Sequence, residues 1–439
     1  MYTVGRIAPW SLSFGMKLSP KQIDWKKTLP LVAFLLGVAI LVSLVFYRAV
    51  SISQMSPQSL FMMAKSESLA ATVDPNVYPG AVWPPGYPLL LLAARKLTVS
   101  FPTTNLLLLL LSLLLVFFIS KIGLPDISPI WITSLFAVCG FNYYNLTQFT
   151  SETLVLPLSL LILLSLVLYQ RRQGFAVLMF LALCGSLLFI TRYHAMLWLA
   201  PIVIGDLILT AYQSRNVPFW HWIGFSVITF SPLGVVLFLN YRNTGFITGM
   251  NRFDWSSRVL TPGMQYFVAS TTFGENIHRI FKSFFLDFGS PFKYASHLAN
   301  KLPYSASALE WAGALLFLAA FGVTVYALIR FLKGRALLGT LSAWRSGSPV
   351  TFLSMGFFLV YILVTIVVWT AGNNDPLYTR YLYPSYIYFM LAMFSGYSLV
   401  KRVGVPRILR SAFVALFVYV FLVNVYKIIL TILMSKKLV

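Results

Sequence analysis

Acidic residues are scarce in this sequence. Its 439 residues include 11 Asp and Glu against 33 Lys and Arg, and all charged residues together make up only 10% of the chain. Hydrophobic residues make up 59%, and the mean hydropathy is +0.80, well above that of an ordinary soluble globular protein. The composition therefore predicts an integral membrane protein and argues against a soluble one.

The sequence has few cysteines and none of the familiar cofactor-binding motifs. The two cysteines, Cys139 and Cys184, lie in or beside apolar segments, which indicates small core residues and not a disulfide or a metal pair. The sequence contains no Walker-type phosphate loop, no dinucleotide-binding fingerprint and no zinc signature. Nucleotide-driven chemistry is therefore unsupported, and no metal site is assigned.

Long apolar runs predict an all-α fold. Residues 106–119 and 154–168 carry no charge and approach the length of a helix that crosses the hydrocarbon core. Because such runs are continuously apolar and not alternating, a sheet barrel is disfavoured. We expect one polytopic membrane domain, residues 1–439, that forms a bundle of about eleven transmembrane helices. The spans are expected near residues 29–47, 104–120, 128–142, 153–169, 175–191, 195–212, 220–240, 306–332, 349–371, 382–399 and 411–433.

Basic clusters orient the bundle and account for most of the formal net charge of +22. Lys and Arg precede the first span and lie between later ones at 171–172 and 401–410, which places these ends on the inner side. Nucleic acid is therefore not an expected partner. Two long segments, residues 48–103 and 240–305, then fall on the outer side. We expect them to carry interfacial helices and the functional residues, because most other connections are short.

The second outer loop is rich in basic residues, against the usual charge bias of membrane proteins. A solvated loop is one explanation, because long translocated loops tolerate charge. The other is a collective role for Arg242, Arg252 and Arg258, whose guanidinium groups would bind the phosphate of an anionic lipid. Arg380 and Tyr381, at the start of the tenth span, would add to this surface.

The segment Trp83-Pro84-Pro85-Gly86-Tyr87-Pro88-Leu89-Leu90-Leu91 resembles the proline pair that opens an interfacial helix after the first outer loop of the C-type glycosyltransferases. These membrane enzymes use polyprenyl-phosphate sugars and include protein O-mannosyltransferases and the aminoarabinose transferases of lipid A. The prolines are expected to fix an extended entry, and Tyr87 to anchor among the lipid headgroups. The resemblance covers most of the chain, and its further motifs follow in order at Ser151-Glu152, Arg192-Tyr193, Asn240–Gly245 and Arg380–Pro384.

The resemblance implies transfer of a hexose or pentose from a polyprenyl-phosphate lipid to a glycan, lipid or protein acceptor. The reaction would take place at the outer face of a bacterial inner membrane. A carboxylate would take the acceptor proton, and cations would stabilise the departing phosphate. The expected substrate- and phosphate-binding residues are Arg192, Tyr193, Arg242, Arg252, Arg258, Arg380 and Tyr381.

The carboxylate is where the sequence departs from this family. At the position where the family usually has its catalytic base, this chain has Gln58, which is neutral and cannot act as a base. The remaining candidates for the catalytic carboxylate are Glu67, Asp74 and Glu152. Glu67 also fits a solvated helix residue, and Asp74 a turn before a proline. Glu152 matches the family's second acidic position, and a carboxylate entering the membrane is costly without a partner. It would bind the donor's amine or hydroxyls, or a divalent cation, unless it is simply a carboxylate at a helix N-terminus.

Two other functions stay open at this point. Gln58 favours a catalytically inactive relative that kept the fold and acts as a lipid-binding subunit. A lipid or solute transporter would instead place an ionisable residue inside the bilayer, and Asp206 lies in an otherwise apolar span.

Overall fold

The computed structural model describes residues 84–137, 142, 151–172, 174–192, 195–214, 218–244, 273–281, 305–332, 349–371 and 379–435. All the regular elements in these segments are α-helices. They are α3 (Gly86–Lys96), α4 (Phe101–Gly123), α5 (Pro129–Ala137), α7 (Glu152–Arg172), α8 (Phe175–Thr191), α9 (Ala195–Ser214), α10 (Phe219–Thr244), α12 (Phe273–Phe281), α14 (Ser305–Leu332), α16 (Pro349–Ala371), α17 (Thr379–Arg402) and α18 (Arg407–Ser435).

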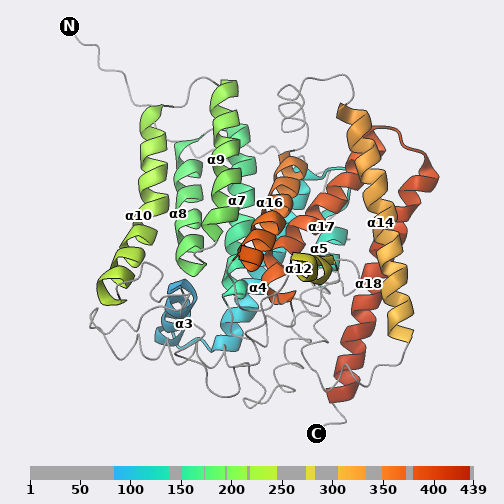
Figure 1. Cartoon of the computed structure of the whole chain (residues 1–439), viewed down its shortest axis with the longest axis horizontal. Helices are drawn as coiled ribbons and strands as arrows, with labels where there is room; N and C mark the ends of the chain where they lie inside the picture. The colour runs from blue at the N-terminus through green and yellow to red at the C-terminus, as the bar shows by residue number, and fades with distance from the viewer. Residues whose placement is uncertain are drawn as a thin grey trace, which may run out of the picture.

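The predicted all-α fold is confirmed for these residues, and the longer helices stand side by side as a bundle (Figure 1). Each predicted span from residue 104 onward corresponds to one helix, although α5 is described only to Ala137. The span predicted near 29–47 lies outside the described residues, as does most of the first outer loop.

Among the described residues, four helices are long and apolar enough to cross a membrane, which marks the chain as a membrane protein. Their apolar stretches are Thr103–Gly123, Glu152–Arg171, Phe219–Leu239 and Pro349–Val367. In the α7 stretch 78% of residues are buried, against 17% in the α10 stretch. Helix α7 is therefore central, whereas α10 turns most of its apolar surface outward, where lipid would cover it.

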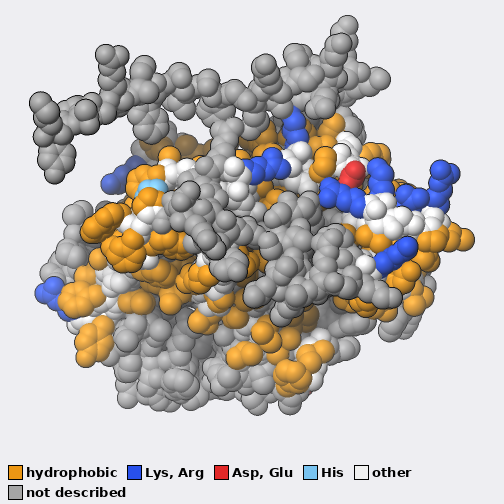
Figure 2. Space-filling model, turned by 90° about the horizontal axis from the view of Figure 1, so that it is seen from above, with side chains coloured by type: hydrophobic (Ala, Val, Ile, Leu, Met, Phe, Trp, Pro, Cys, Tyr) orange, Lys and Arg blue, Asp and Glu red, His pale blue; other side chains and the backbone are white. Residues whose placement is uncertain are grey.

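The helices alternate in direction, so the bundle has two distinct ends. At one end the Arg171 guanidinium, near the end of α7, donates to the Ile122 carbonyl near the end of α4, at 3.0 Å. A side chain at Gly123 would collide with Val350, so α16 begins at this end too. We call it the basic end because it carries Lys121, Arg171, Lys401, Arg402, Arg407 and Arg410. Figure 2, which looks onto the bundle from above, shows Lys and Arg side chains gathered there.

An aromatic cluster holds α9, α16 and α17 together in the middle of the bundle. Trp198 of α9 is 1% exposed and packs edge-on against Tyr361, with ring centroids 5.0 Å apart. Phe357 and Tyr388 stack at 4.8 Å. Aromatic pairs of this kind contribute about 0.5–1.5 kcal/mol each beyond their burial. The cluster thereby holds α9 against α16 and α17.

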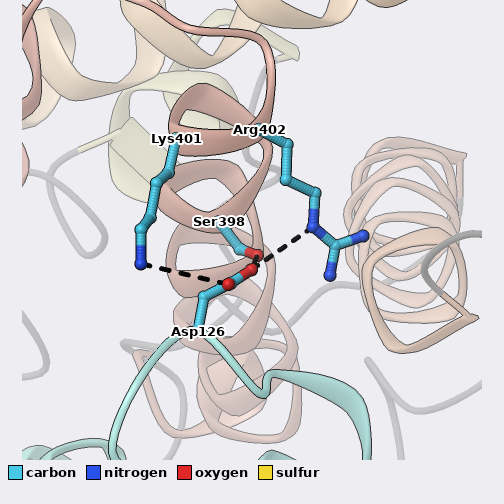
Figure 3. A network of polar contacts seen from close by, with 4 residues as sticks. All are labelled: Asp126, Ser398, Lys401 and Arg402. Atoms are coloured by element: carbon cyan, nitrogen blue, oxygen red, sulfur yellow. Dashed lines mark hydrogen bonds and ion pairs between the residues drawn. The ribbon is translucent and has the colours of Figure 1, made fainter.

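A network of polar side chains connects helices at the basic end. Asp126, in the turn between α4 and α5, accepts hydrogen bonds from the Ser398 hydroxyl at 2.6 Å and from the Arg402 Nε at 3.3 Å (Figure 3). Lys401 Nζ lies 4.0 Å from the other carboxylate oxygen. The Ser398 hydrogen bond is the largest influence that holds the pKa of Asp126 below its ordinary value, and Arg402 and Lys401 add to it. The network ties the α4–α5 turn to the end of α17.

We expect Asp126→Asn to lower the unfolding temperature in detergent by about 1–3 °C at pH 7, the scale of a partly exposed ion pair. Because the folded protein holds the pKa of Asp126 below the unfolded value of about 4, the stabilisation is complete above that value. It is lost as the pH falls through the lower, folded pKa.

The difference between Asp126→Asn and the natural chain should therefore shrink as the pH is lowered below about 4. Arg407→Gln removes an exposed charge from the same end and serves as the control. A difference that grows on acidification would contradict a stabilising role for the ionised carboxylate.

Candidate functional site

The segment Pro84–Tyr87 begins α3 at the end of the bundle opposite the basic end. Pro85 is the N-cap residue, with φ −77° and ψ −15°, and its carbonyl accepts the first helical hydrogen bond from Leu89 at 2.9 Å. The expected extended entry is therefore wrong at Pro85, which is already helical. The ring of proline fixes φ near the helical value, and the residue that follows Pro85 is a glycine, so nothing forces Pro85 out of this region.

Tyr87 is buried and does not anchor at the headgroups, contrary to expectation. Its side chain is 0% exposed, and its hydroxyl donates to Asn105 Oδ1 at 2.8 Å. Thr153, near the start of α7, also hydrogen-bonds this hydroxyl, and burial raises the pKa of Tyr87, so it stays protonated. A buried tyrosine needs such a polar partner. Tyr87 thus joins α3 to the second turn of α4 and the first turn of α7.

Gly86 lies directly against the last residue of α8. A Cβ at this position would lie 2.9 Å from the backbone Cα and N of Thr191, closer than real Cβ contacts come. Because the obstacle is backbone, no side-chain rotation can relieve it. Glycine here allows α3 to pack onto the end of α8, immediately beside Arg192.

Glu152 and Arg192 form a buried ion pair at this point. Glu152 is the first residue of α7, and Arg192 is the C-cap residue of α8. The Arg192 guanidinium contacts the carboxylate, and the two side chains are only 10% and 1% exposed. The Ser151 hydroxyl also donates to Glu152 Oε2, at 3.3 Å. An acid at a helix N-terminus and a base at a helix C-terminus both interact favourably with the helix dipoles.

The structure therefore brings together two of the predicted site residues, Glu152 and Arg192, and places the proline motif against them. Arg242 lies exposed at the end of α10. Helix α10 runs parallel to α8, because Phe175 pairs with His221 near their starts and Phe189 with Phe230 farther along. Arg242 consequently lies toward the same end of the bundle as the ion pair.

The other predicted site residues lie partly or wholly outside the part of the chain that the structure describes. Arg380 and Tyr381 belong to the first turn of α17, which starts at the site end, but their side chains lie outside what the structure describes. The remaining ones lie wholly outside the described residues: Glu67, Asp74, Tyr193, Arg252 and Arg258, together with Gln58. Within the described ranges, no group of three or more His, Cys, Asp or Glu side chains could hold a metal ion.

Sequence reasoning did not single out Asn105 and Thr153. Asn105 is 0% exposed and is a strongly polar residue in the second turn of an apolar helix. A polar side chain at such a place is costly unless it has a partner, so Asn105 itself was a usable signal. Thr153 carried no comparable signal, because threonine occurs throughout membrane helices.

Comparisons with protein-family models, with curated proteins and with solved structures find no match for this chain. The resemblance to C-type glycosyltransferases therefore stays a prediction from the order of motifs along the sequence. Function has to be inferred from the residues of the site and from their arrangement.

The ion pair should be strongly coupled. We expect Glu152→Gln and Arg192→Met each to destabilise the protein by about 3–5 kcal/mol, because each leaves the other charge buried without its partner. The double variant should cost much less than the sum, since it buries no unpaired charge. A double-mutant cycle on unfolding in detergent measures the coupling, and additive effects would show that the two side chains do not interact.

Gly86 should tolerate no side chain. Gly86→Ala is expected to destabilise by about 1–3 kcal/mol, because α3 must shift away from the backbone of Thr191. Gly205→Ala, in α9, is the matched control: a Cβ there meets nothing within 4 Å, and alanine favours a helix. Thermal unfolding of both variants in detergent makes the comparison, and equal effects would rule out a close contact at Gly86.

Proposed function

We propose that this protein is a membrane glycosyltransferase that moves a sugar from a polyprenyl-phosphate donor to an acceptor at the outer membrane face. The Glu152–Arg192 pair carries the proposal. Burying two charges costs several kcal/mol per ion before their attraction repays it, and well-packed apolar residues would often serve stability as well or better. Buried ionisable groups in a membrane protein are therefore candidates for function.

The proposed topology has eleven spans, with residues 29–47 as the first and the long segments 48–103 and 240–305 on the outer side. The positive-inside rule puts the basic end in the cytoplasm of a bacterium. The Glu152–Arg192 pair then faces the outer leaflet of the inner membrane. The proline motif and the start of α17 lie on the same side, as the resemblance implies for a lipid-linked donor.

In the proposed reaction, an acceptor hydroxyl or amine attacks the anomeric carbon of the donor sugar. The bond from this carbon to the phosphate oxygen breaks, and the polyprenyl phosphate leaves with both electrons of that bond. A guanidinium has five N–H donors, more than one carboxylate accepts. Arg192 can therefore bind a phosphate oxygen while it contacts Glu152 and stabilise the charge that develops there. Arg242 and Arg380 would bind the same phosphate group.

The acceptor proton needs a base. Glu152 already forms an ion pair with Arg192 and accepts a hydrogen bond from Ser151, so its proposed role is to hold Arg192 in place and to receive hydrogen bonds from the donor's hydroxyls or amine. Glu67 and Asp74, in the first outer loop, are the proposed bases. Tyr193 and Tyr381 would contact the sugar, and Arg252 and Arg258 the outer surface of the donor.

A second candidate function is a catalytically inactive lipid-binding subunit, and Gln58 is the observation that favours it. A transporter gains no support from Asp206. This residue is 2% exposed, and it accepts a hydrogen bond from Gln170 at 2.6 Å. Gln170 lies two residues before the end of α7, so Asp206 belongs near the basic end and not at the middle of the bundle.

The direct test uses the purified full-length protein in liposomes with radiolabelled polyprenyl-phosphate sugars. We expect donor binding and release of polyprenyl phosphate. Arg242→Gln, at the site end, should weaken donor binding about tenfold or more, the scale of a charge-assisted hydrogen bond. Lys121→Gln removes a positive charge from the basic end and should leave binding unchanged.

The outcomes separate the two candidate functions. Turnover that Glu152→Gln abolishes while the protein stays folded supports the glycosyltransferase. Donor binding without turnover, with transfer gained in Gln58→Asp, would identify the inactive relative. Absence of binding to every polyprenyl-phosphate sugar by folded protein would overturn both.

A further inference from the structure

We propose that the basic end of the bundle holds a binding site for an anionic phospholipid of the inner leaflet. In this site, Arg407 and Arg410 bind the phosphate, and an apolar crevice between α5, α14, α17 and α18 takes an acyl chain. This inference rests on the proposed orientation of the bundle, with the basic end on the inner side, but not on the proposed glycosyl transfer, which concerns the opposite end of the molecule.

The basic residues of this end divide into neutralised and unneutralised ones. Asp126 interacts with both Lys401 and Arg402. Within the described residues, Arg407 and Arg410 make no recorded ion pair, and Arg410 Nε is buried without a hydrogen-bond partner. Arg407 and Arg410 are therefore outside the Asp126 network and share the first turn of α18, whereas Lys121 and Arg171 lie near the ends of α4 and α7.

The position of these two arginines is electrostatically unfavourable unless an anion is present. They occupy the first turn of α18, where the helix dipole adds positive potential to their own charge. The turn before them is tight, because Val405 N–H donates to the Val400 carbonyl at 3.2 Å and Gly404 adopts a positive φ of 74°. The turn thus holds the end of α17 and the start of α18 together, and a phosphate would relieve the repulsion.

An apolar crevice lies below this turn. Its lining includes Leu135 of α5, Phe317 of α14, Phe394 of α17 and Phe417 of α18. Phe394 and Phe417 stack with ring centroids 4.2 Å apart and form one wall. The four helices make contacts with one another around it and stand together on one side of the bundle (Figure 1).

The distance between the two arginines and the apolar crevice, measured along the helices, matches the distance between the headgroup and the acyl chains of a phospholipid. Phe417 is seven residues beyond Arg410, and Phe394 seven residues before Lys401, so the crevice begins about 10 Å along each helix from the basic side chains. The headgroup layer of a bilayer is roughly 5–8 Å thick on each side. Arginines at headgroup level thus place the crevice among the acyl chains, and Trp131, 62% exposed in the first turn of α5, marks the interface.

The occupant is an anionic phospholipid because both parts of the site must be satisfied at once. A zwitterionic lipid would bring its own cation toward the two arginines, and a soluble phosphate would leave the crevice unused. The inner leaflet of cell membranes is the one that carries anionic lipid, and juxtamembrane basic residues contribute about a fivefold gain in binding each.

The test compares lipid binding to the full-length protein in detergent by native mass spectrometry and by the rise in unfolding temperature. Dioleoyl phosphatidylglycerol should bind and stabilise the protein, and dioleoyl phosphatidylcholine should not. The variant Arg407→Gln/Arg410→Gln should lose about thirtyfold in affinity for phosphatidylglycerol. The control, Arg95→Gln/Lys96→Gln, removes two exposed charges from the last turn of α3, at the opposite end, and should lose nothing.

Each remaining outcome decides the proposal. Equal binding of the two lipids, or equal loss in the two double variants, would overturn it, because attraction would then be unspecific. Displacement of the lipid by soluble glycerol phosphate would overturn the acyl-chain part and with it the site as proposed. If the double variant does not fold, Arg407→Gln alone, at an exposed position, should still lose about fivefold, and no loss there would overturn the proposal.

Discussion

The buried ion pair of Glu152 and Arg192 is the interaction on which the arrangement of this end of the bundle depends. It joins the first residue of α7 to the residue that ends α8. At this buried place, water would not solvate an unpaired charge. The contacts of Gly86 with Thr191 and of Tyr87 with Asn105 place α3 against the same residues. Four chain segments that are distant in sequence therefore meet around one carboxylate.

The two ends of the bundle are held together by different kinds of interaction. At the basic end, Asp126 is 27% exposed and bonds to Ser398, Lys401 and Arg402 near water, where each such pair is worth little. At the site end the polar contacts are buried, so each is costly to break. Asp126 and Glu152 thus stabilise the two ends of the bundle to different extents.

Much of the fold could be predicted because spans depend on apolar length, which a sequence displays directly. The limits of α8 and α16 agree with the predicted 175–191 and 349–371. The site was predictable only as separate residues. Glu152 and Arg192 were each recognisable as charges at helix ends, but their pairing depends on how α7 and α8 pack. The position of Tyr87 was predicted wrongly because a tyrosine can lie either among lipid headgroups or in a buried site where its hydroxyl is hydrogen-bonded. The hydrogen bond to Asn105 shows that Tyr87 is in a buried site.

The length of α8 has a consequence for the lipid around it. Its 17 residues span about 25 Å, less than the roughly 30 Å of a typical hydrocarbon core. A bilayer adapts to such a mismatch by thinning beside the short helix. The leaflet at the site end of the bundle would dimple where α8 ends, and lipid phosphates would sink toward Arg192. A molecule arriving from the aqueous side would then meet the ion pair below the general level of the membrane surface.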